Sequence, residues 1–255
     1  MALGRSACST HRVFAPDEID AVVFDMGGVF LIPAPEPIRA VLREAGVEVG
    51  FDGDDAHHAH YRGVRAITEL LTHAVVDERE PGTWSHYDKA YFGSIGLSGA
   101  DLERTIAARD RIRRAELVEN VWTFELKHNI SAFARISSQR PVAIVTNNNG
   151  TAVQQCLDHR ICQLDDGPLP RVAAIVDSTV IQIAKPDPRI FQPAIDALGT
   201  RPSRTLYVGD TVHADIHGAT AAGMPAVQLD PLDLHGDHSH WRLPDVVSLA
   251  DRFSS

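Results

Sequence analysis

A carboxylate at the end of an apolar, strand-like run is the first feature of this sequence that could do chemistry. Asp25 directly follows the run Ile19–Phe24 and precedes the glycines Gly27 and Gly28. A carboxylate presented in this way can attack phosphorus and form an aspartyl-phosphate, which divides hydrolysis into two displacements. A single Asp after a strand more commonly serves as a helix N-cap or a turn residue. Asp25 alone leaves both interpretations open.

A second acidic residue, Asp210, ends another strand-like run, Thr205–Val208, after Gly209. Two carboxylates within a few ångströms repel each other unless a proton or a cation lies between them. Mg²⁺ prefers oxygen ligands and also binds phosphate, so it would meet this need. Asp215 begins the next predicted helix, where it either supports the metal from an outer shell or is a first-turn Asp favoured by the helix dipole.

Two more polar residues stand at comparable places in the chain. Thr146 follows the apolar run Val142–Val145 and precedes a turn into a helix, where a hydroxyl and free N–H groups can hold phosphate oxygens. An ordinary turn residue is the alternative. Lys185 lies in the segment Ala184–Pro188 (AKPDP), whose prolines fix the loop and start a helix. Its ammonium would offset the charge of phosphate and of the additional carboxylate.

These residues can meet only if the runs that precede them form one sheet. The strand-like runs are Ile19–Phe24, Val142–Val145, Val172–Val176, Thr205–Val208 and Pro225–Leu229. The helical patterns that follow are Lys127–Ser138, Gly150–His159, Pro188–Leu198 and Ala214–Ala222. This alternation predicts βαβ units and a parallel sheet. Because ligands bind beyond the carboxyl ends of such strands, we expect the polar residues to converge on one edge.

A long stretch after the first strand, from Pro33 to Trp122, contains no comparable strand. It carries four helical patterns, Glu36–Ala45, Asp54–Ala74, Thr83–Ile95 and Ser98–Glu116. We predict an α/β core of residues 1–32 and 123–255 and a helical cap of residues 33–122 over the active edge. The alternative is a helical domain that is merely attached to the core.

Composition excludes some functions and bounds the location. The chain has 255 residues and a formal net charge of −10, which argues against a non-specific nucleic-acid binder, because such proteins need a basic face. The longest apolar runs fall far below the ~20 residues needed to span a bilayer. The start of the chain lacks the apolar stretch of a secretory signal, and its 3 Cys residues have no CxxC spacing. We therefore expect a cytoplasmic protein with reduced thiols, in which Cys156 and Cys162 are packing residues.

From Ala21 to Leu229 the sequence resembles the haloacid dehalogenase superfamily. Four segments carry the resemblance: FDMGGV from Phe24, VTNN from Val145, KPDPRIF from Lys185, and VGD from Val208 together with Asp215. The resemblance implies a Rossmann-like, doubly wound core, a helical cap of the C1 type, Mg²⁺, and usually phosphatase activity on a small phosphorylated metabolite. It implies Asp25 and Lys185 as catalytic residues, Thr146, Asn147 and Lys185 as substrate-binding residues, and Asp25, Gly27, Asp210 and Asp215 as metal-binding residues.

One departure from the family pattern concerns the general acid and base. Phosphatases that the sequence resembles usually carry a second Asp two positions after the nucleophile, and Gly27 stands there. The backbone carbonyl of Gly27 can still bind metal, but proton transfer to the leaving group is lost, a contribution of ~10²–10⁴-fold. The enzyme is then slow, uses good leaving groups, or takes a proton carrier from elsewhere, for which His213 is one candidate.

Three functions remain after this departure. The first is Mg²⁺-dependent hydrolysis of phosphoric monoesters, and the second is carbon–halogen hydrolysis, which needs no metal and in this family usually has Tyr where Gly27 stands. The third is a non-catalytic module that binds phosphorylated metabolites. The oligomeric state stays open.

Several other polar or aromatic residues suggest ligand binding only weakly. The histidines of two groups have no metal-ligand spacing, so we predict solvated faces for His57, His58, His60, His235, His238 and His240. Four cap residues either line the pocket or pack within the cap, namely Arg62, Trp84, His86 and Tyr87.

Overall fold

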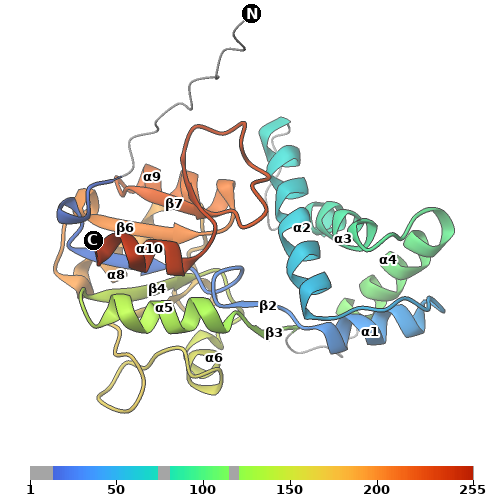
Figure 1. The fold of residues 1–255 in the computed structure, drawn as a ribbon, viewed down its shortest axis with the longest axis horizontal. Helices are drawn as coiled ribbons and strands as arrows, with labels where there is room; N and C mark the ends of the chain where they lie inside the picture. Colours follow the sequence, from blue (N-terminus) through green and yellow to red (C-terminus); the bar gives the residue numbers. More distant parts are fainter. Residues whose placement is uncertain (1–13, 74–80, 115–120, 255) are drawn as a thin grey trace, which may run out of the picture.

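A six-stranded parallel sheet forms the centre of the molecule (Figure 1). The computed structural model describes residues 14–73, 81–114 and 121–254. The strand order is β5-β4-β1-β6-β7-β8, and every pairing in this sheet is parallel. The strands are β1 (Ala21–Phe24), β4 (Val142–Thr146), β5 (Ile175–Asp177), β6 (Thr205–Gly209), β7 (Ala226–Leu229) and β8 (Trp241–Leu243). The predicted parallel α/β fold is therefore confirmed.

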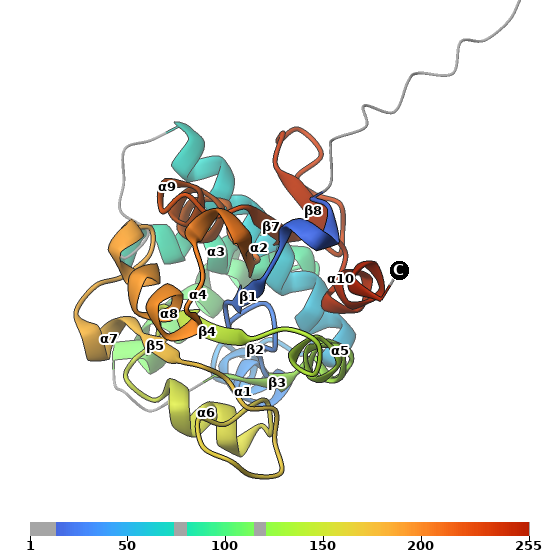
Figure 2. The ribbon, with the colours of Figure 1, turned by 90° about the vertical axis from the view of Figure 1, so that its left-hand side faces the viewer.

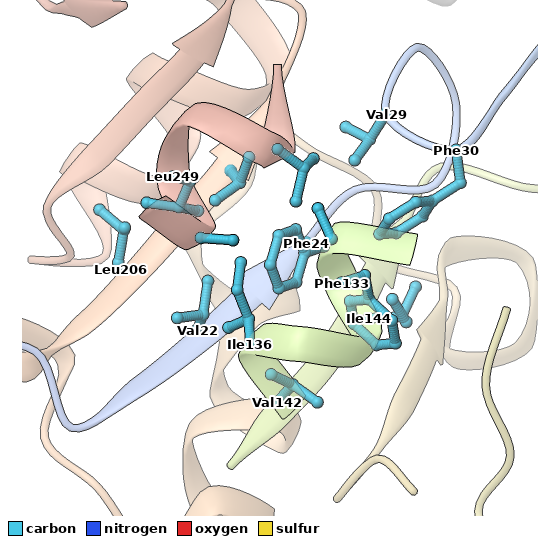
Figure 3. Packing of buried hydrophobic residues seen from close by; sticks show 14 of the residues in the cluster. Val22, Phe24, Val29, Phe30, Phe133, Ile136, Val142, Ile144, Leu206 and Leu249 are labelled. Atoms are coloured by element: carbon cyan, nitrogen blue, oxygen red, sulfur yellow. The ribbon is translucent and has the colours of Figure 1, made fainter. Parts of the chain in front are cut away.

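Helices cover both faces of the sheet. Alternate side chains of each strand point to opposite faces, and both faces carry apolar side chains that need to be buried. Val22 and Phe24 of β1 pack with α5 and α10 (Figure 3), whereas Val23 packs with residues of α8 and α9. Figure 2 shows these helices on either side of the sheet. The helices of the core are α5 (Lys127–Ser137), α6 (Ala152–Asp158), α7 (Ser178–Ile181), α8 (Gln192–Leu198), α9 (Gly218–Ala221) and α10 (Val246–Phe253). Short 3-10 or π turns are η1 (Pro16–Glu18), η2 (Pro188–Phe191), η3 (Pro202–Arg204) and η4 (Val212–His217).

The first four α-helices of the described chain form the cap, which has its own hydrophobic core. They are α1 (Pro35–Glu44), α2 (Gly53–His73), α3 (Pro81–Ser94) and α4 (Gly99–Arg114). A two-stranded antiparallel ribbon, β2 (Leu31–Pro33) with β3 (Trp122–Glu125), joins the cap to the core (Figure 1). The chain therefore leaves the core and returns to it at one place, while the residue boundaries of the two parts stay a prediction.

Several predicted elements differ from the structure at their ends. The run Val172–Val176 forms a strand only from Ile175 onward, although Ala173 N–H already donates to the Val142 carbonyl of β4. The helical pattern Pro188–Leu198 is a 3-10 turn followed by α8, and the pattern Ala214–Ala222 is the π-helical η4 followed by α9. The strand β8 and the ribbon were not predicted from the sequence, because each is very short.

The cysteines and the membrane prediction have clear outcomes. Cys156 and Cys162 are buried in the core, as predicted for packing residues, and Cys8 lies outside the described residues, as does most of the N-terminal segment. Within the described part of the chain, no helix is both long enough and apolar enough to cross a bilayer.

Candidate active site

Three carboxylates meet beyond the carboxyl ends of β1 and β6. Asp25 follows β1, and Asp210 follows its neighbour β6, so parallel pairing alone brings them together. Asp215 reaches the same point from η4. One oxygen from each residue lies within 4.8 Å of the others, and all three side chains are buried. The predicted convergence of Asp25, Asp210 and Asp215 is thus present in the structure.

The ammonium of Lys185 lies in the middle of this acidic cluster. Its Nζ lies 2.6 Å from Asp215 Oδ1, 3.0 Å from Asp25 Oδ1 and 3.0 Å from the Tyr207 hydroxyl. Burial by itself would lower the pKa of Lys185, but the negative charges of Asp215 and Asp25 outweigh it and raise that pKa. Lys185 therefore stays charged. Tyr207, which sequence reasoning missed, also donates to Asp215 Oδ1 at 2.9 Å and holds this carboxylate from β6.

Asp215 has both of its oxygens occupied by protein donors. Lys185 and Tyr207 bond to Oδ1, while the backbone N–H and the hydroxyl of Thr211 donate to Oδ2 at 2.9 and 2.8 Å. Despite burial, the charge of Lys185 and these hydrogen bonds lower the pKa of Asp215. This environment suits a carboxylate that holds Lys185 in place better than one that faces a metal ion directly.

Asp25 and Asp210 have fewer compensating partners: the Lys185 ammonium lies beside Asp25, and His60 Nε2 lies beside Asp210. Burial raises the pKa of Asp25 to about 7 and that of Asp210 to about 8, and the repulsion of neighbouring carboxylates adds to it. Asp25 Oδ1 is buried and accepts no hydrogen bond, although the Lys185 ammonium is near. The cluster therefore has more negative charge than Lys185 offsets. Hard oxygen ligands with an excess of negative charge fit a divalent cation such as Mg²⁺.

The two glycines after Asp25 have different reasons to be glycine. Gly28 has a φ of 65°, and a Cβ there would lie 2.0 Å from Asp210 Oδ2, so any side chain would displace that carboxylate. A Cβ on Gly27 would lie 3.3 Å from the indole ring of Trp122. Trp122 thus stands against the side on which the family's second Asp would project.

The residues predicted to hold phosphate divide into two groups. Thr146 is buried at the end of β4 and lines the same cavity as Asp25. The Asn147 side chain instead bonds to the backbone of Lys185: its Oδ1 accepts from Lys185 N–H at 2.8 Å, and its Nδ2 donates to Lys185 O at 3.1 Å. Asn147 therefore fixes the loop that presents Lys185, and it also lines the cavity.

A cavity of about 400 Å³ lies between the carboxylate cluster and the cap. Its described cap wall is mostly apolar and aromatic. That wall consists of His60, Val64, Ile67, Trp84, Tyr87, Arg109, Val121 and Trp122. Of the four cap residues that the sequence left undecided, Trp84 and Tyr87 line the cavity, whereas Arg62 and His86 do not. His213 is also absent from its lining.

The prediction of solvated faces was wrong for His60 and His235, which are buried. His60 lies on α2 and contacts Asp210 directly, with Nε2 3.0 Å from Oδ2. A signal for its burial existed in the sequence, because His60, Val64, Ile67 and Leu71 recur at helical spacing on one face. His235 packs against Asp230 and the hydroxyl of Thr68 on α2.

Comparisons with known proteins agree with this geometry. The family model of haloacid dehalogenase-like hydrolases matches residues 19–223 of the chain. The chain belongs to this family. This hydrolase is 31% identical to the phosphoserine phosphatase of Thermus thermophilus over 214 residues, which cover 75% of this chain and 81% of that protein. It is also 44% identical to the glyceraldehyde 3-phosphate phosphatase of Methanopyrus kandleri over 55 residues, which cover 22% of this chain and 24% of that protein.

Solved structures with the same fold come from the same family. A HAD-hydrolase of Bacillus subtilis bound to magnesium matches with a TM-score of 0.55 at 14% identity, covering 93% of this chain and 99% of that one. A 2-haloacid dehalogenase of Pseudomonas syringae pv. Tomato matches with a TM-score of 0.52 at 18% identity, covering 92% of this chain and 98% of that one. At these identities the likeness shows the fold alone. The chain is accordingly a hydrolase with phosphatases among its relatives.

The raised pKa values predict how the stability of the metal-free protein depends on pH. Asp25 and Asp210 titrate near pH 7 and 8 in the folded state, whereas an unfolded Asp titrates near about 3.9. Between these values the folded state binds more protons than the unfolded state, so the free energy of unfolding falls as the pH rises. We expect the thermal midpoint in EDTA to fall between about pH 6 and pH 8, and Mg²⁺ to remove most of the fall.

Asp25→Asn is the control for this pH dependence, because it removes one of the two titrating groups and leaves the histidines in place. The variant should show a shallower fall over the same range. A midpoint in EDTA that rises or stays level for the unmodified protein, with no difference from Asp25→Asn, would contradict the raised pKa values.

Proposed function

We propose that this hydrolase is a Mg²⁺-dependent phosphatase that acts on phosphoric monoesters of small metabolites. In the first displacement a carboxylate oxygen of Asp25 bonds to phosphorus, the bond from phosphorus to the alcohol oxygen breaks, and the alcohol leaves with a proton from solvent. In the second, water attacks the aspartyl-phosphate and releases inorganic phosphate and the Asp25 carboxylate. The observation that carries this proposal is the buried Asp25–Asp210 pair beside a charged Lys185.

Each residue near Asp25 has a role that follows from its contacts. Lys185 offsets phosphate charge close to the nucleophile, and Asp215 holds Lys185 in position. The Thr146 hydroxyl and nearby backbone N–H groups, including that of Asn147, orient the phosphate. Asp25, the Gly27 carbonyl and Asp210 would hold Mg²⁺, with Asp215 behind them. When bound, Mg²⁺ supplies charge stabilisation to the phosphoryl oxygens.

The named relatives support phosphate esters over carbon–halogen bonds. The phosphoserine phosphatase of Thermus thermophilus shares most of its length with this chain, whereas the likeness to a haloacid dehalogenase is at the level of the fold. Carbon–halogen hydrolysis also gives no reason for Asp210 to lie beside Asp25, because that reaction needs no metal. A non-catalytic binding module stays the second candidate, since Gly27 removes the usual proton carrier.

The cap wall of the cavity gives a direction for substrate preference. Val64, Ile67 and Val121 are buried aliphatic residues that line it, and Trp84 and Trp122 add two indole rings. A charged group on the alcohol part of a substrate would lose hydration against these five side chains, which offer it no charged partner. Arg109 is the cation of the described cap wall and lies outside this apolar set. We therefore expect the favoured monoesters to carry an apolar or aromatic alcohol.

Replacing the nucleophile tests the reaction. Asp25→Asn should abolish release of nitrophenolate from p-nitrophenyl phosphate with Mg²⁺, because an amide oxygen does not form the aspartyl-phosphate. The control is Asp251→Asn, which changes an exposed acid on α10 and should keep full turnover. Comparable turnover in Asp25→Asn would refute the nucleophile. Binding of phosphorylated metabolites without turnover in the unmodified protein would favour the binding module.

Restoring the family's acid tests the departure at Gly27. Gly27→Asp should raise turnover of alkyl phosphates, with poor leaving groups, by up to ~10²-fold while changing p-nitrophenyl phosphate little. We expect a smaller gain than the ~10⁴-fold upper limit of general acid–base catalysis. The reason is that the indole of Trp122 must shift by a few tenths of an ångström to admit the new side chain. Gly27→Asn is the matched control of equal size. An equal gain in both variants would show that proton transfer is not the cause.

A pair of substrates with similar leaving groups tests the apolar wall. We expect kcat/KM for benzyl phosphate to exceed that for phosphoserine by at least ~10-fold, from the burial of one aromatic ring. Trp84→Ala should reduce this ratio while leaving hydrolysis of phosphoserine nearly unchanged. A preference for phosphoserine would contradict the apolar interpretation and leave the proposed chemistry intact.

A further inference from the structure

His60 connects the cap directly to the carboxylate cluster. It lies on α2, its side chain is fully buried, and its two ring nitrogens have separate partners. Nε2 is 3.0 Å from Asp210 Oδ2, and Nδ1 is 2.8 Å from the hydroxyl of Tyr87 on α3. A cap side chain therefore reaches one of the two acids that we propose as ligands of Mg²⁺.

The two hydrogen bonds define one arrangement of protons when Asp210 is ionised. Nε2 then carries the hydrogen and donates to the carboxylate, so Nδ1 must accept from the Tyr87 hydroxyl. The phenol of Tyr87 has one hydrogen to donate, and it lies 2.8 Å from Nδ1. The N–H of His60 that remains is the one at Nε2, which points at Asp210.

The position of the imidazole is fixed by rings on either side. The ring of Trp122 meets it edge-on with centroids 5.2 Å apart, and the ring of Tyr61 lies 4.8 Å away. Tyr61 also donates to the Gly28 carbonyl at 2.7 Å, which ties α2 to the turn after Asp25. His60 therefore has little freedom to turn away while α2 keeps this position.

Asp210 has a hydrogen-bond partner at its backbone carbonyl and another at its carboxylate. Gln228 on β7 donates to its backbone carbonyl at 2.8 Å, and Gly28 leaves the space that its carboxylate occupies. His60 bonds to Oδ2 and so sets the rotation of the carboxylate about its last torsion. Carboxylate ligands of metals are commonly oriented by hydrogen bonds of this kind, and removal of such a partner costs about 10–100-fold in metal affinity.

We propose that His60 is a positioning residue by which the cap controls metal binding: it donates to Asp210 Oδ2 and holds the carboxylate in the orientation that the ion needs. The proposal rests on the function proposed above, since it takes Asp210 as a metal ligand. Its consequence is that the cap does more than select the substrate. The metal site is complete only while α2 is seated against the core.

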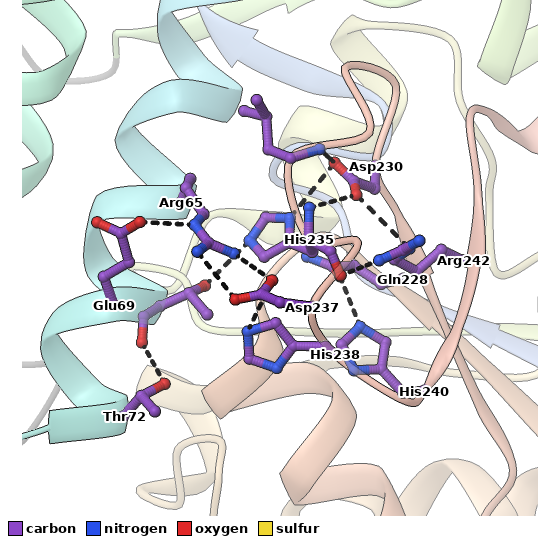
Figure 4. A network of polar contacts seen from close by, with 12 residues as sticks. Arg65, Glu69, Thr72, Gln228, Asp230, His235, Asp237, His238, His240 and Arg242 are labelled. Atoms are coloured by element: carbon purple, nitrogen blue, oxygen red, sulfur yellow. Dashed lines mark hydrogen bonds and ion pairs between the residues drawn. The ribbon is translucent and has the colours of Figure 1, made fainter. Parts of the chain in front are cut away.

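The same helix carries a second set of cap–core contacts that provides a control. Arg65 on α2 bonds to both carboxylate oxygens of Asp237, at 2.7 and 3.1 Å, in the segment after β7 (Figure 4). Thr68 contacts His235 in that segment. Loss of the Arg65 contact removes one ion pair between cap and core and leaves the other contacts of α2, including that of His60 with Asp210, in place. It therefore separates a general loss of cap–core contacts from a loss of the hydrogen bond that orients Asp210.

The test measures Mg²⁺ binding by titration calorimetry on the full chain without substrate. We expect His60→Ala to weaken Mg²⁺ affinity by about 10–100-fold. His60→Gln, whose amide N–H also can donate, should recover much of the loss, and Tyr87→Phe should lose less than His60→Ala. Arg65→Ala should stay near the affinity of the unmodified protein. Thermal unfolding in EDTA checks that each variant is folded. If His60→Ala does not fold, His60→Gln replaces it as the test variant.

The outcomes separate this proposal from the proposed function. Unchanged or tighter Mg²⁺ binding in His60→Ala overturns the positioning role of His60 and leaves Asp210 as a ligand. A loss of Mg²⁺ affinity in Arg65→Ala as large as that in His60→Ala overturns it in the same way. If His60→Ala does not fold, an affinity in His60→Gln below that of Tyr87→Phe overturns it as well. Absence of Mg²⁺ binding in the unmodified protein would overturn the proposed function, and the role of His60 with it.

Discussion

Burial of several like charges around one ammonium is the constraint on which the rest of this site depends. Asp25, Asp210 and Asp215 are all nearly inaccessible to water, and the Lys185 ammonium offsets part of their charge. Such a cluster is unfavourable in a low-dielectric interior unless protons or a cation complete it. The pKa values of Asp25 and Asp210 are raised for this reason, with burial as the largest cause.

The fold makes this closeness unavoidable. Parallel pairing of β1 with β6 puts the residues that follow them side by side. The register Phe24↔Val208 leaves Asp25 one residue beyond it and Asp210 two residues beyond it. Glycines then provide the space: a Cβ on Gly28 would overlap Asp210, and a Cβ on Gly209 would lie 2.3 Å from the carboxyl carbon of Asp215. The glycines beside the acids are therefore part of how the carboxylates fit.

The cap closes the site with a different chemistry from that of the core. The core supplies charge at the strand ends, and the cap supplies indole, phenol and aliphatic groups around a cavity of about 400 Å³. Trp122 lies where a side chain on Gly27 would project, and His60 lies against Trp122 and bonds to Asp210. The departure at Gly27 is thus accompanied by an aromatic group in that space, which connects the loss of the usual acid to the shape of the pocket.

The sequence by itself determined the sheet, its strand ends and the acids that stand there, because apolar runs and the residues that follow them are local signals. Asp25, Thr146 and Asp210 were found in this way, as was a helical insertion after the first strand, and Lys185 was found from the prolines of its loop. Only the tertiary structure decided that Asn147 supports the Lys185 loop, that Tyr207 and Thr211 occupy Asp215, and that His60 lies on Asp210. Those contacts join residues from separate elements, and a side chain's partner across such a distance depends on how the elements pack and on which groups burial leaves in need of a hydrogen bond.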